Sequence, residues 1–223
     1  MRETARAYAL NVIGGLAPLL ETEFLVLADY IIEHPDSVSR PPKGLTIADE
    51  AYWSKIAERF VDGRKVRQLA KPNTVPDPMV SLILQIFYGI ESERLDQIKR
   101  EHALSMVAEN SVGDLLERYI SEEIGGAGWV WISGSLIRSV DFIRRAESGG
   151  FDELQIKNRD NSENSSSSSV RKDTNIKKWY RTKSKTGETM WEEFPLDSDD
   201  LKPLSEQGFR EFVLRYLPSV MQD

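Results

Sequence analysis

The chain has 223 residues and a formal net charge of −7, with 40% hydrophobic and 29% charged residues, a composition typical of soluble globular proteins. It has no cysteine and only His34 and His102, which excludes disulfides and thiol catalysis and disfavours a His-based metal site or a Ser-His-Asp triad. No apolar run approaches the roughly 20 residues that cross a bilayer, and the N-terminus does not resemble a signal peptide. Any hydrolytic chemistry is therefore expected to use carboxylates, lysine, tyrosine or a hard metal ion held by oxygens.

The first 124 residues are predicted to be mostly helical. Apolar residues recur every three or four positions over residues 3–34, with a break within 14–18. Thr46 followed by Asp49 resembles a capping pattern and predicts one or two further helices over the next residues. Amphipathic segments continue after a loop, with a helix break expected near Asn110.

Strands are predicted after residue 124. Trp129 and Trp131 alternate in the first of them, and the stretch FDELQIKNR at 151–159 predicts another. A β-hairpin is predicted further on, with Trp179 on one arm, a Lys-Thr-Gly turn, and Trp191 on the other. With a final amphipathic helix, this order predicts an α/β (α+β) fold, a small mixed sheet flanked by helices behind a mostly helical N-terminal half.

The strand at 151–159 carries polar residues at every second position. Glu153, Gln155 and Lys157 therefore share one face, while Leu154 and Ile156 point the opposite way into a core. This pattern places a carboxylate, an amide and an ammonium in one row.

Asp141 lies between the apolar residues Val140 and Phe142 near the end of the preceding strand pattern. A hairpin through the following turn would bring Asp141 beside Gln155. An aspartate and an amide oxygen are hard ligands suited to Mg²⁺, and a lysine beside them can orient an attacking water. Glu117, on a helix just before the first strand, could reach the same metal.

This arrangement resembles the PD-(D/E)xK nucleases, in particular the SinI-type type II restriction endonucleases. The resemblance implies Mg²⁺ as cofactor, with Asp141 as principal metal ligand, Gln155 as a second oxygen ligand, and Lys157 orienting and activating the water. Gln155 stands where the family pattern has an acidic residue, so Glu153 is the alternative metal ligand, and Glu117 adds negative charge.

The resemblance extends over most of the chain, from TVPDPMVSLIL through DLLERYI to KWYRTKSKTGETMWEEF. It implies a prokaryotic, cytoplasmic homodimer that cuts double-stranded DNA at a short palindrome such as GGWCC, paired with a cognate DNA methyltransferase and with no membrane partner. One nuclease domain, 1–223, is expected. Within it, 1–110 is expected to form a mostly helical scaffold and dimerisation part, and 111–223 the catalytic core with the DNA-reading loop and hairpin.

Positive charge gathers after the predicted catalytic strand. From Lys157 to Lys185 nine Lys or Arg face three Asp or Glu, a net charge of +6 that leaves −13 for the rest of the chain. Such asymmetry indicates an anion-binding face, and Asn, Arg and Ser are the side chains that contact bases and phosphates. The predicted DNA-binding residues are Asn158, Arg159, Asn161, Asn164, Ser165, Ser166, Ser167, Arg171, Lys177, Lys178, Arg181, Lys183 and Lys185.

Other interpretations stay open at this point. The run Ser165 to Ser169 is typical of a flexible linker, and Glu117 could be a solvated helix residue. A non-catalytic DNA-binding regulator could read DNA with a helix-turn-helix in 46–70. The segment around Trp191 partly resembles half of a WW domain, although no partner tryptophan stands about twenty residues earlier.

Overall fold

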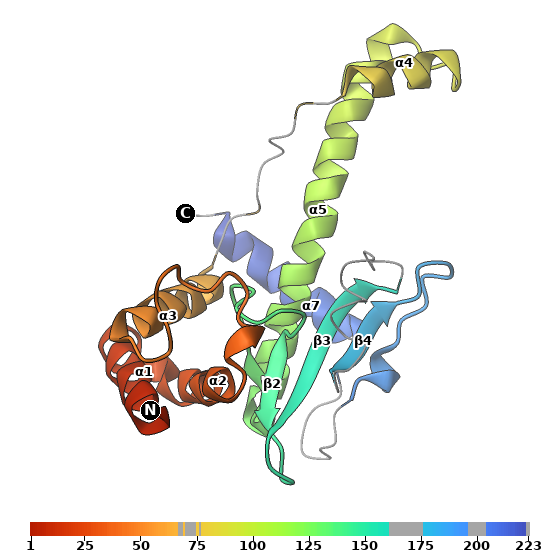
Figure 1. Ribbon diagram of the computed structural model, residues 1–223. Coiled ribbons are helices and arrows are strands. Elements are labelled where there is room, and N and C mark those ends of the chain that lie inside the picture. The colour runs from red at the N-terminus through yellow and green to blue at the C-terminus, as the bar shows by residue number, and fades with distance from the viewer. Residues whose placement is uncertain (67–68, 70–74, 76, 161–175, 196–203, 222–223) are drawn as a thin grey trace.

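The structure is a computed structural model, and it describes residues 1–66, 69, 75, 77–160, 176–195 and 204–221. Its helices precede and flank a small sheet (Figure 1), which confirms the predicted α+β class. The helices are α1 (Arg2–Leu16), α2 (Glu21–Glu33), α3 (Glu50–Arg64), α4 (Pro78–Ile86), α5 (Ser92–Ile124) and α7 (Glu206–Val220). The strands are β1 (Val130–Trp131), β2 (Phe142–Arg145), β3 (Phe151–Arg159) and β4 (Lys177–Thr182). No helix in the described part of the chain is long and apolar enough to span a bilayer.

The structure confirms two of the predicted helix boundaries and contradicts a third. Pro18 begins a short 3-10 turn between α1 and α2, and Asp49 is the residue before α3, with its carboxylate accepting from the Thr46 amide at 2.8 Å. The break expected near Asn110 is wrong, because α5 continues to Ile124. Residues 105–115 hold no proline, and Gly113 lowers helix stability by only about 1 kcal/mol.

The four strands lie in the order β1-β2-β3-β4. The first three are antiparallel neighbours, whereas β4 pairs with β3 in parallel, Lys157 opposite Tyr180. The sheet is therefore mixed, as predicted.

The predicted hairpin around Lys185 is only partly present. Met190 donates to the Arg181 carbonyl at 2.8 Å, but past one isolated bridge the return arm forms no strand, and Trp191 begins a 3-10 turn. Trp191 instead lies in the core with its ring 4.9 Å from that of Trp179. Burying this indole requires the chain to leave the sheet plane, which explains why the second arm of the hairpin is lost.

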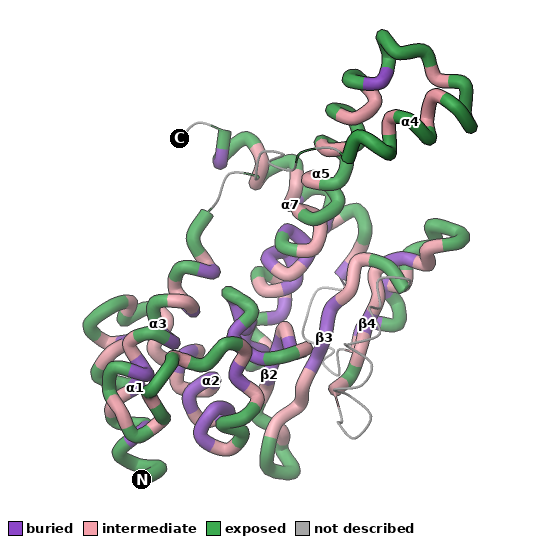
Figure 2. The backbone as a smooth tube through the Cα atoms, turned by 45° about the horizontal axis from the view of Figure 1, so that its top comes forward, coloured by how far each residue is buried: buried purple, intermediate pink, exposed green. Residues whose placement is uncertain are grey.

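Apolar residues cover both faces of the sheet. Val130 and Ile143 pack with helices α1 to α3, while Phe142, Leu154 and Trp179 pack with α5 and α7. Figure 2 shows the buried residues following the strands and the C-terminal half of α5. Alternation along each strand thus divides the side chains between two cores.

Two arginines join the helical half to the sheet. Arg118 of α5 is buried and donates to the carbonyls of Gly63, Arg64 and Lys65 at the C-terminal end of α3, at 3.0–3.1 Å. Arg64 donates to the Trp131 carbonyl at 2.9 Å and lies over the Phe60 ring. These bonds satisfy carbonyls that a helix end leaves open, and they fix α5 relative to β1.

We expect Gly63→Ala to destabilise the protein by about 2–4 kcal/mol. An added Cβ would lie 2.4 Å from the Gly134 amide nitrogen and 2.8 Å from Ser133 atoms, so backbone must move. The matched control is Gly113→Ala in α5, where nothing lies within 4 Å; it should stabilise by roughly 0.5–1 kcal/mol. Urea unfolding measures both, and equal effects at the two positions would contradict the close packing of α3 on this turn.

Candidate functional site

Asp141 and Gln155 lie side by side, as the sequence predicted. The Asp141 amide donates to the Leu154 carbonyl at 2.9 Å, and the Asp141 carboxylate accepts from the Ile156 amide at 2.7 Å. Gln155 between them is 4% exposed. Asp141 stands just before β2 rather than at the end of a strand, which corrects the expected boundary because the apolar pattern upstream forms turns.

Glu117 reaches this site from α5. The Trp131 indole nitrogen donates to the Glu117 carboxylate at 2.9 Å. Burial raises the pKa of Glu117 well above its ordinary range, the negative charge of Asp141 raises it further, and the charge of Lys157 opposes the rise. Glu117, Asp141 and Lys157 are therefore close enough to act on one another.

Burial also raises the pKa of Asp141. The hydrogen bond from the Ile156 amide and the positive charge of Lys157 both lower this pKa and so partly oppose the rise. Two carboxylates that share a low-dielectric site are costly in their charged forms. A bound cation would relieve this cost. The described residues include no cluster of three or more His, Cys, Asp or Glu able to hold a metal, so any ligand set must add amide, carbonyl or water oxygens to the two carboxylates.

Glu153 is engaged elsewhere. It pairs in register with Ile143, two residues along β3 from Gln155, and the Tyr30 hydroxyl of α2 donates to its carboxylate at 2.5 Å. Burial, followed by this contact, raises the pKa of the Tyr30 hydroxyl, which keeps that hydroxyl a donor. The geometry thus places Gln155, rather than Glu153, next to Asp141.

Three of the predicted DNA-binding residues, Asn158, Arg181 and Lys183, make side-chain hydrogen bonds or ion pairs within the chain. Arg181 donates to the Asn158 side-chain oxygen at 2.9 Å and pairs with Glu206 at 2.6 Å, with its side chain 14% exposed. Lys183 pairs with Glu188 at 2.7 Å in the turn after β4. These contacts favour a structural role for Arg181, and its assignment to DNA contact stays a prediction.

The other basic residues lie along the strand ends. Arg159, Lys177 and Lys185 are exposed. Lys178 is opposite Gln155 in the parallel β3–β4 pair and approaches the Tyr180 ring at 5.5 Å, so it shares the strand face of Gln155. The remaining predicted DNA-binding residues lie outside the described part of the chain: Asn161, Asn164, Ser165, Ser166, Ser167 and Arg171. The structure therefore does not distinguish a flexible linker from a DNA-reading loop in this segment.

Sequence reasoning missed the groups that hold the carboxylates. Trp131 was predicted only as part of a strand; its side chain is buried, and its indole nitrogen donates to Glu117. Tyr30 lies 123 residues from Glu153, and its helix shows only an amphipathic pattern. The one available signal was the alternation that points Trp131 towards the α5 face of the sheet.

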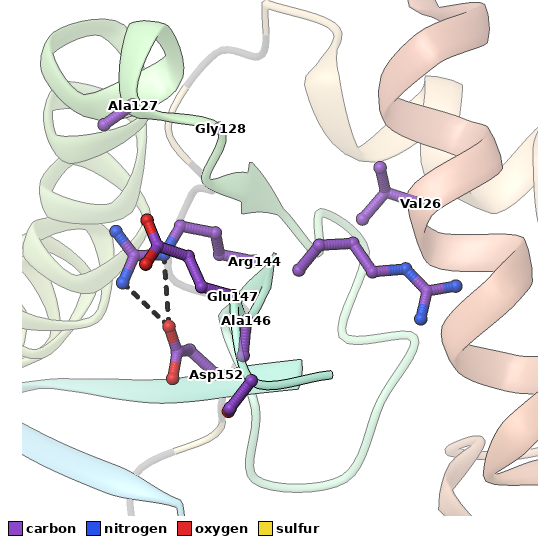
Figure 3. Close-up of a pocket in the computed structure, with 9 residues that line it drawn as sticks. Val26, Ala127, Gly128, Arg144, Ala146, Glu147 and Asp152 are labelled. Atoms are coloured by element: carbon purple, nitrogen blue, oxygen red, sulfur yellow. Dashed lines mark hydrogen bonds and ion pairs between the residues drawn. The ribbon is translucent and has the colours of Figure 1, made fainter. Parts of the chain in front are cut away.

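The cavity shown in Figure 3 is a separate feature. It has a volume of about 810 Å³ and lies at the β2–β3 turn, lined by Arg144, Arg145 and Asp152 among others. Arg144 is bonded to Asp152 at 2.7 Å, and Arg145 pairs with Asp29 and Glu33 of α2. Because Asp141 lies at the opposite end of β2, this cavity is no part of the candidate site.

Glu117→Gln is expected to stabilise the protein at alkaline pH in the absence of divalent cations. The folded-state pKa of Glu117 lies above its ordinary value of 4.5, so its contribution to stability is present in acid and is lost as pH rises through the folded-state pKa. The variant should gain on the order of 1–3 kcal/mol near pH 9 and little near pH 5. Urea unfolding in EDTA at both pH values measures this.

The matched control for this measurement is Glu109→Gln, at an exposed position of the same helix, which should change stability equally little at both pH values. A Glu117→Gln variant whose advantage does not grow with pH would contradict the buried, charge-crowded environment of Glu117.

A small mixed sheet flanked by helices, with an aspartate and a Gln-x-Lys strand beside a helix-borne glutamate, defines a nuclease-like α+β protein. Residues 9–219 match the family model of the SinI restriction endonuclease. The chain is 41% identical over 223 residues to the type II restriction enzyme Eco47I of Escherichia coli, covering 98% of this chain and 96% of that one. It is 41% identical over 224 residues to the type II restriction enzyme SinI of Salmonella infantis, with the same coverage. The chain therefore belongs to the SinI restriction endonuclease family.

Proposed function

We propose that this protein is a type II restriction endonuclease that hydrolyses both strands of double-stranded DNA at a short palindrome, with GGWCC as the first candidate site. The observation that carries the proposal is the meeting of Asp141, Gln155 and Lys157 beside Glu117 where the start of β2 lies against β3. Membership of the restriction endonuclease family supports it.

The residues of the site suit Mg²⁺. Asp141 and the side-chain oxygen of Gln155 would hold the ion, Glu117 would add negative charge, and Glu153 is disfavoured by its bond to Tyr30. Bound Mg²⁺ would supply a polarised water and positive charge against the scissile phosphate. Lys157 would orient that water for direct in-line attack on phosphorus, with no covalent enzyme intermediate.

The proposed cleavage of a palindrome also implies an oligomeric state, a partner enzyme and a location in the cell. A palindrome presents two equivalent strands, so a homodimer with one active site per chain fits it, with 1–223 as one nuclease domain in each chain. A host must protect its own copies of the site, which implies a cognate DNA methyltransferase. The protein would act in the prokaryotic cytoplasm, where the DNA is.

Two alternative functions are less well supported. Trp191 is buried against Trp179, which removes the exposed ring that a WW-like peptide groove needs. A non-catalytic DNA-binding regulator would not need buried carboxylates beside a lysine, and it is separated from the nuclease by cleavage itself.

The test is a digest of a plasmid that contains GGWCC, with mapped fragment ends. We expect discrete fragments with Mg²⁺ and none with EDTA, and a matched plasmid lacking GGWCC should stay intact if that site is the right one. Specific DNA binding without cleavage under any divalent cation would support the regulator instead. Discrete fragments cut at another sequence would support the nuclease activity and show that the recognition sequence is not GGWCC.

A further inference from the structure

Helix α4 and the N-terminal half of α5 form an arm, residues 77–110, that projects from the rest of the described chain (Figure 1). Gly89, with a φ of 65°, makes the turn between the two helices. The Gln85 amide donates to the Ser92 hydroxyl at 2.8 Å and holds the turn closed. The arm is thus an ordered helical hairpin.

The arm belongs to neither hydrophobic core. Both clusters of buried residues leave out every described residue between 66 and 111, and Leu95 is the arm's only buried residue among those described. Helices of this length are marginal in water unless an apolar face is packed. Among the described residues of one chain, the arm therefore lacks the packing that would support it.

The surface of α4 is apolar on several sides. A helix that is apolar all round is ordinarily buried, yet Phe87 is 79% exposed and Ile86 76%. We call the exposed apolar residues of α4 and of the turn that follows it the α4 patch, and contiguous exposed apolar surface of this kind marks an interaction site. The residues of the patch are Met79, Val80, Leu82, Ile83, Ile86, Phe87 and Tyr88.

The charges of the arm disfavour DNA as the occupant. No charged residue lies between Asp77 and Glu91, and residues 77–110 hold three Lys or Arg against six Asp or Glu. Their net charge of −3 contrasts with the +6 of Lys157 to Lys185, and DNA contact requires cations against the phosphates. An uncharged, apolar helix favours a protein partner with a similar surface.

We propose that the α4 patch is the interface between two copies of this chain, packed patch against patch about a two-fold axis. A two-fold contact uses the same surface on both chains, and an apolar patch without charges is complementary to itself. The proposal rests on the proposed function, since a palindromic site needs two active sites. It goes further by placing the dimer contact on the arm.

The experiment measures the mass of the DNA-free protein by sedimentation equilibrium. We expect twice the chain mass of 25.4 kDa for the wild type, and a dissociation constant raised about 30-fold or more by Ile86→Glu with Phe87→Glu. The matched control is Leu214→Glu on α7, which is 64% exposed and should leave the dimer unchanged. Circular dichroism confirms that each variant is folded.

A second measurement does not rely on disruptive substitutions. Because the chain has no cysteine, Ile86→Cys and Leu214→Cys each carry a single thiol, and a short bismaleimide should link chains through Ile86→Cys alone. A monomeric wild type, or a dimer unaffected by the double substitution, overturns the proposal. A monomeric protein that still cuts the plasmid would contradict the proposed dimer contact on the arm but not the proposed nuclease activity. A dimeric protein that never cuts would contradict the nuclease activity but not the dimer contact.

Discussion

Lys157→Ala is expected to lower the single-turnover rate of DNA cleavage by about 10²–10⁴-fold, the range for removing one positioned proton-transfer or charge-stabilising group. The charge of Lys157 acts on both Asp141 and Glu117, so the alanine variant loses the cation of the site while its acidic groups stay. DNA affinity in EDTA should fall less than about tenfold, because one phosphate contact among many is lost. Quenched-flow cleavage with saturating enzyme and a mobility-shift titration measure the two quantities.

Lys185→Ala is the matched control for this prediction. Lys185 is exposed in the turn after β4, so its loss should weaken DNA binding slightly and leave the cleavage rate at saturation unchanged. If Lys157→Ala cut as fast as the wild type, the assignment of the active site to this strand would be wrong. If it lost binding as well as cleavage, Lys157 would be a DNA-contact residue rather than a catalytic one.

The pairing of Asp141 with Gln155 in the candidate site could be predicted because the two residues are close in sequence. Asp141 and Gln155 are separated by one short hairpin, and the period of two along β3 fixes which side chains share a face. The structure bears out their adjacency through the Asp141 to Ile156 hydrogen bond. The mostly helical N-terminal half was equally accessible, since three- and four-residue periodicity is strong there.

What could not be predicted depends on contacts between distant segments. The parallel pairing of β4 with β3 has no local signature, and the turn at Lys185 favoured a complete hairpin instead. The burial of Trp191 against Trp179 overrides that local preference. The ion pair of Arg181 with Glu206 of the last helix likewise has no local signature, and the DNA contact predicted for Arg181 stays a prediction.

The long-range bonds bear on a choice that the sequence left open. The hairpin was predicted to bring Gln155 beside Asp141, while Glu153, on the same face of the strand, stayed the alternative metal ligand. The bond from Tyr30 holds Glu153 against α2, and the register of β2 and β3 places Gln155 at the Asp141 end. With an amide beside Asp141, the proposed site would take its negative charge mainly from Asp141 and Glu117.

Asp141→Asn is the substitution expected to separate these roles most sharply. The amide has the same shape and keeps an oxygen that can accept from the Ile156 amide, so the fold should persist. Removing the charge should lower the cleavage rate by about 10³-fold or more, because the proposed carboxylate ligand of Mg²⁺ is lost. In EDTA at neutral pH the variant should be more stable than the wild type by about 1 kcal/mol, since a buried charge beside Glu117 is gone.

Thermal unfolding with and without Mg²⁺ gives the decisive comparison. A ligand that binds only the folded state raises its stability by an amount set by its concentration and affinity, so Mg²⁺ should raise the Tm of the wild type and leave that of Asp141→Asn nearly unchanged. The matched control is Asp152→Asn on the same sheet, which breaks the ion pair with Arg144 and should keep both cleavage and the Mg²⁺ effect. An Asp141→Asn variant that Mg²⁺ stabilises as fully as the wild type would move the metal away from Asp141. Glu117 and Lys157 would then lose their proposed roles with it, because both are placed by their proximity to that carboxylate.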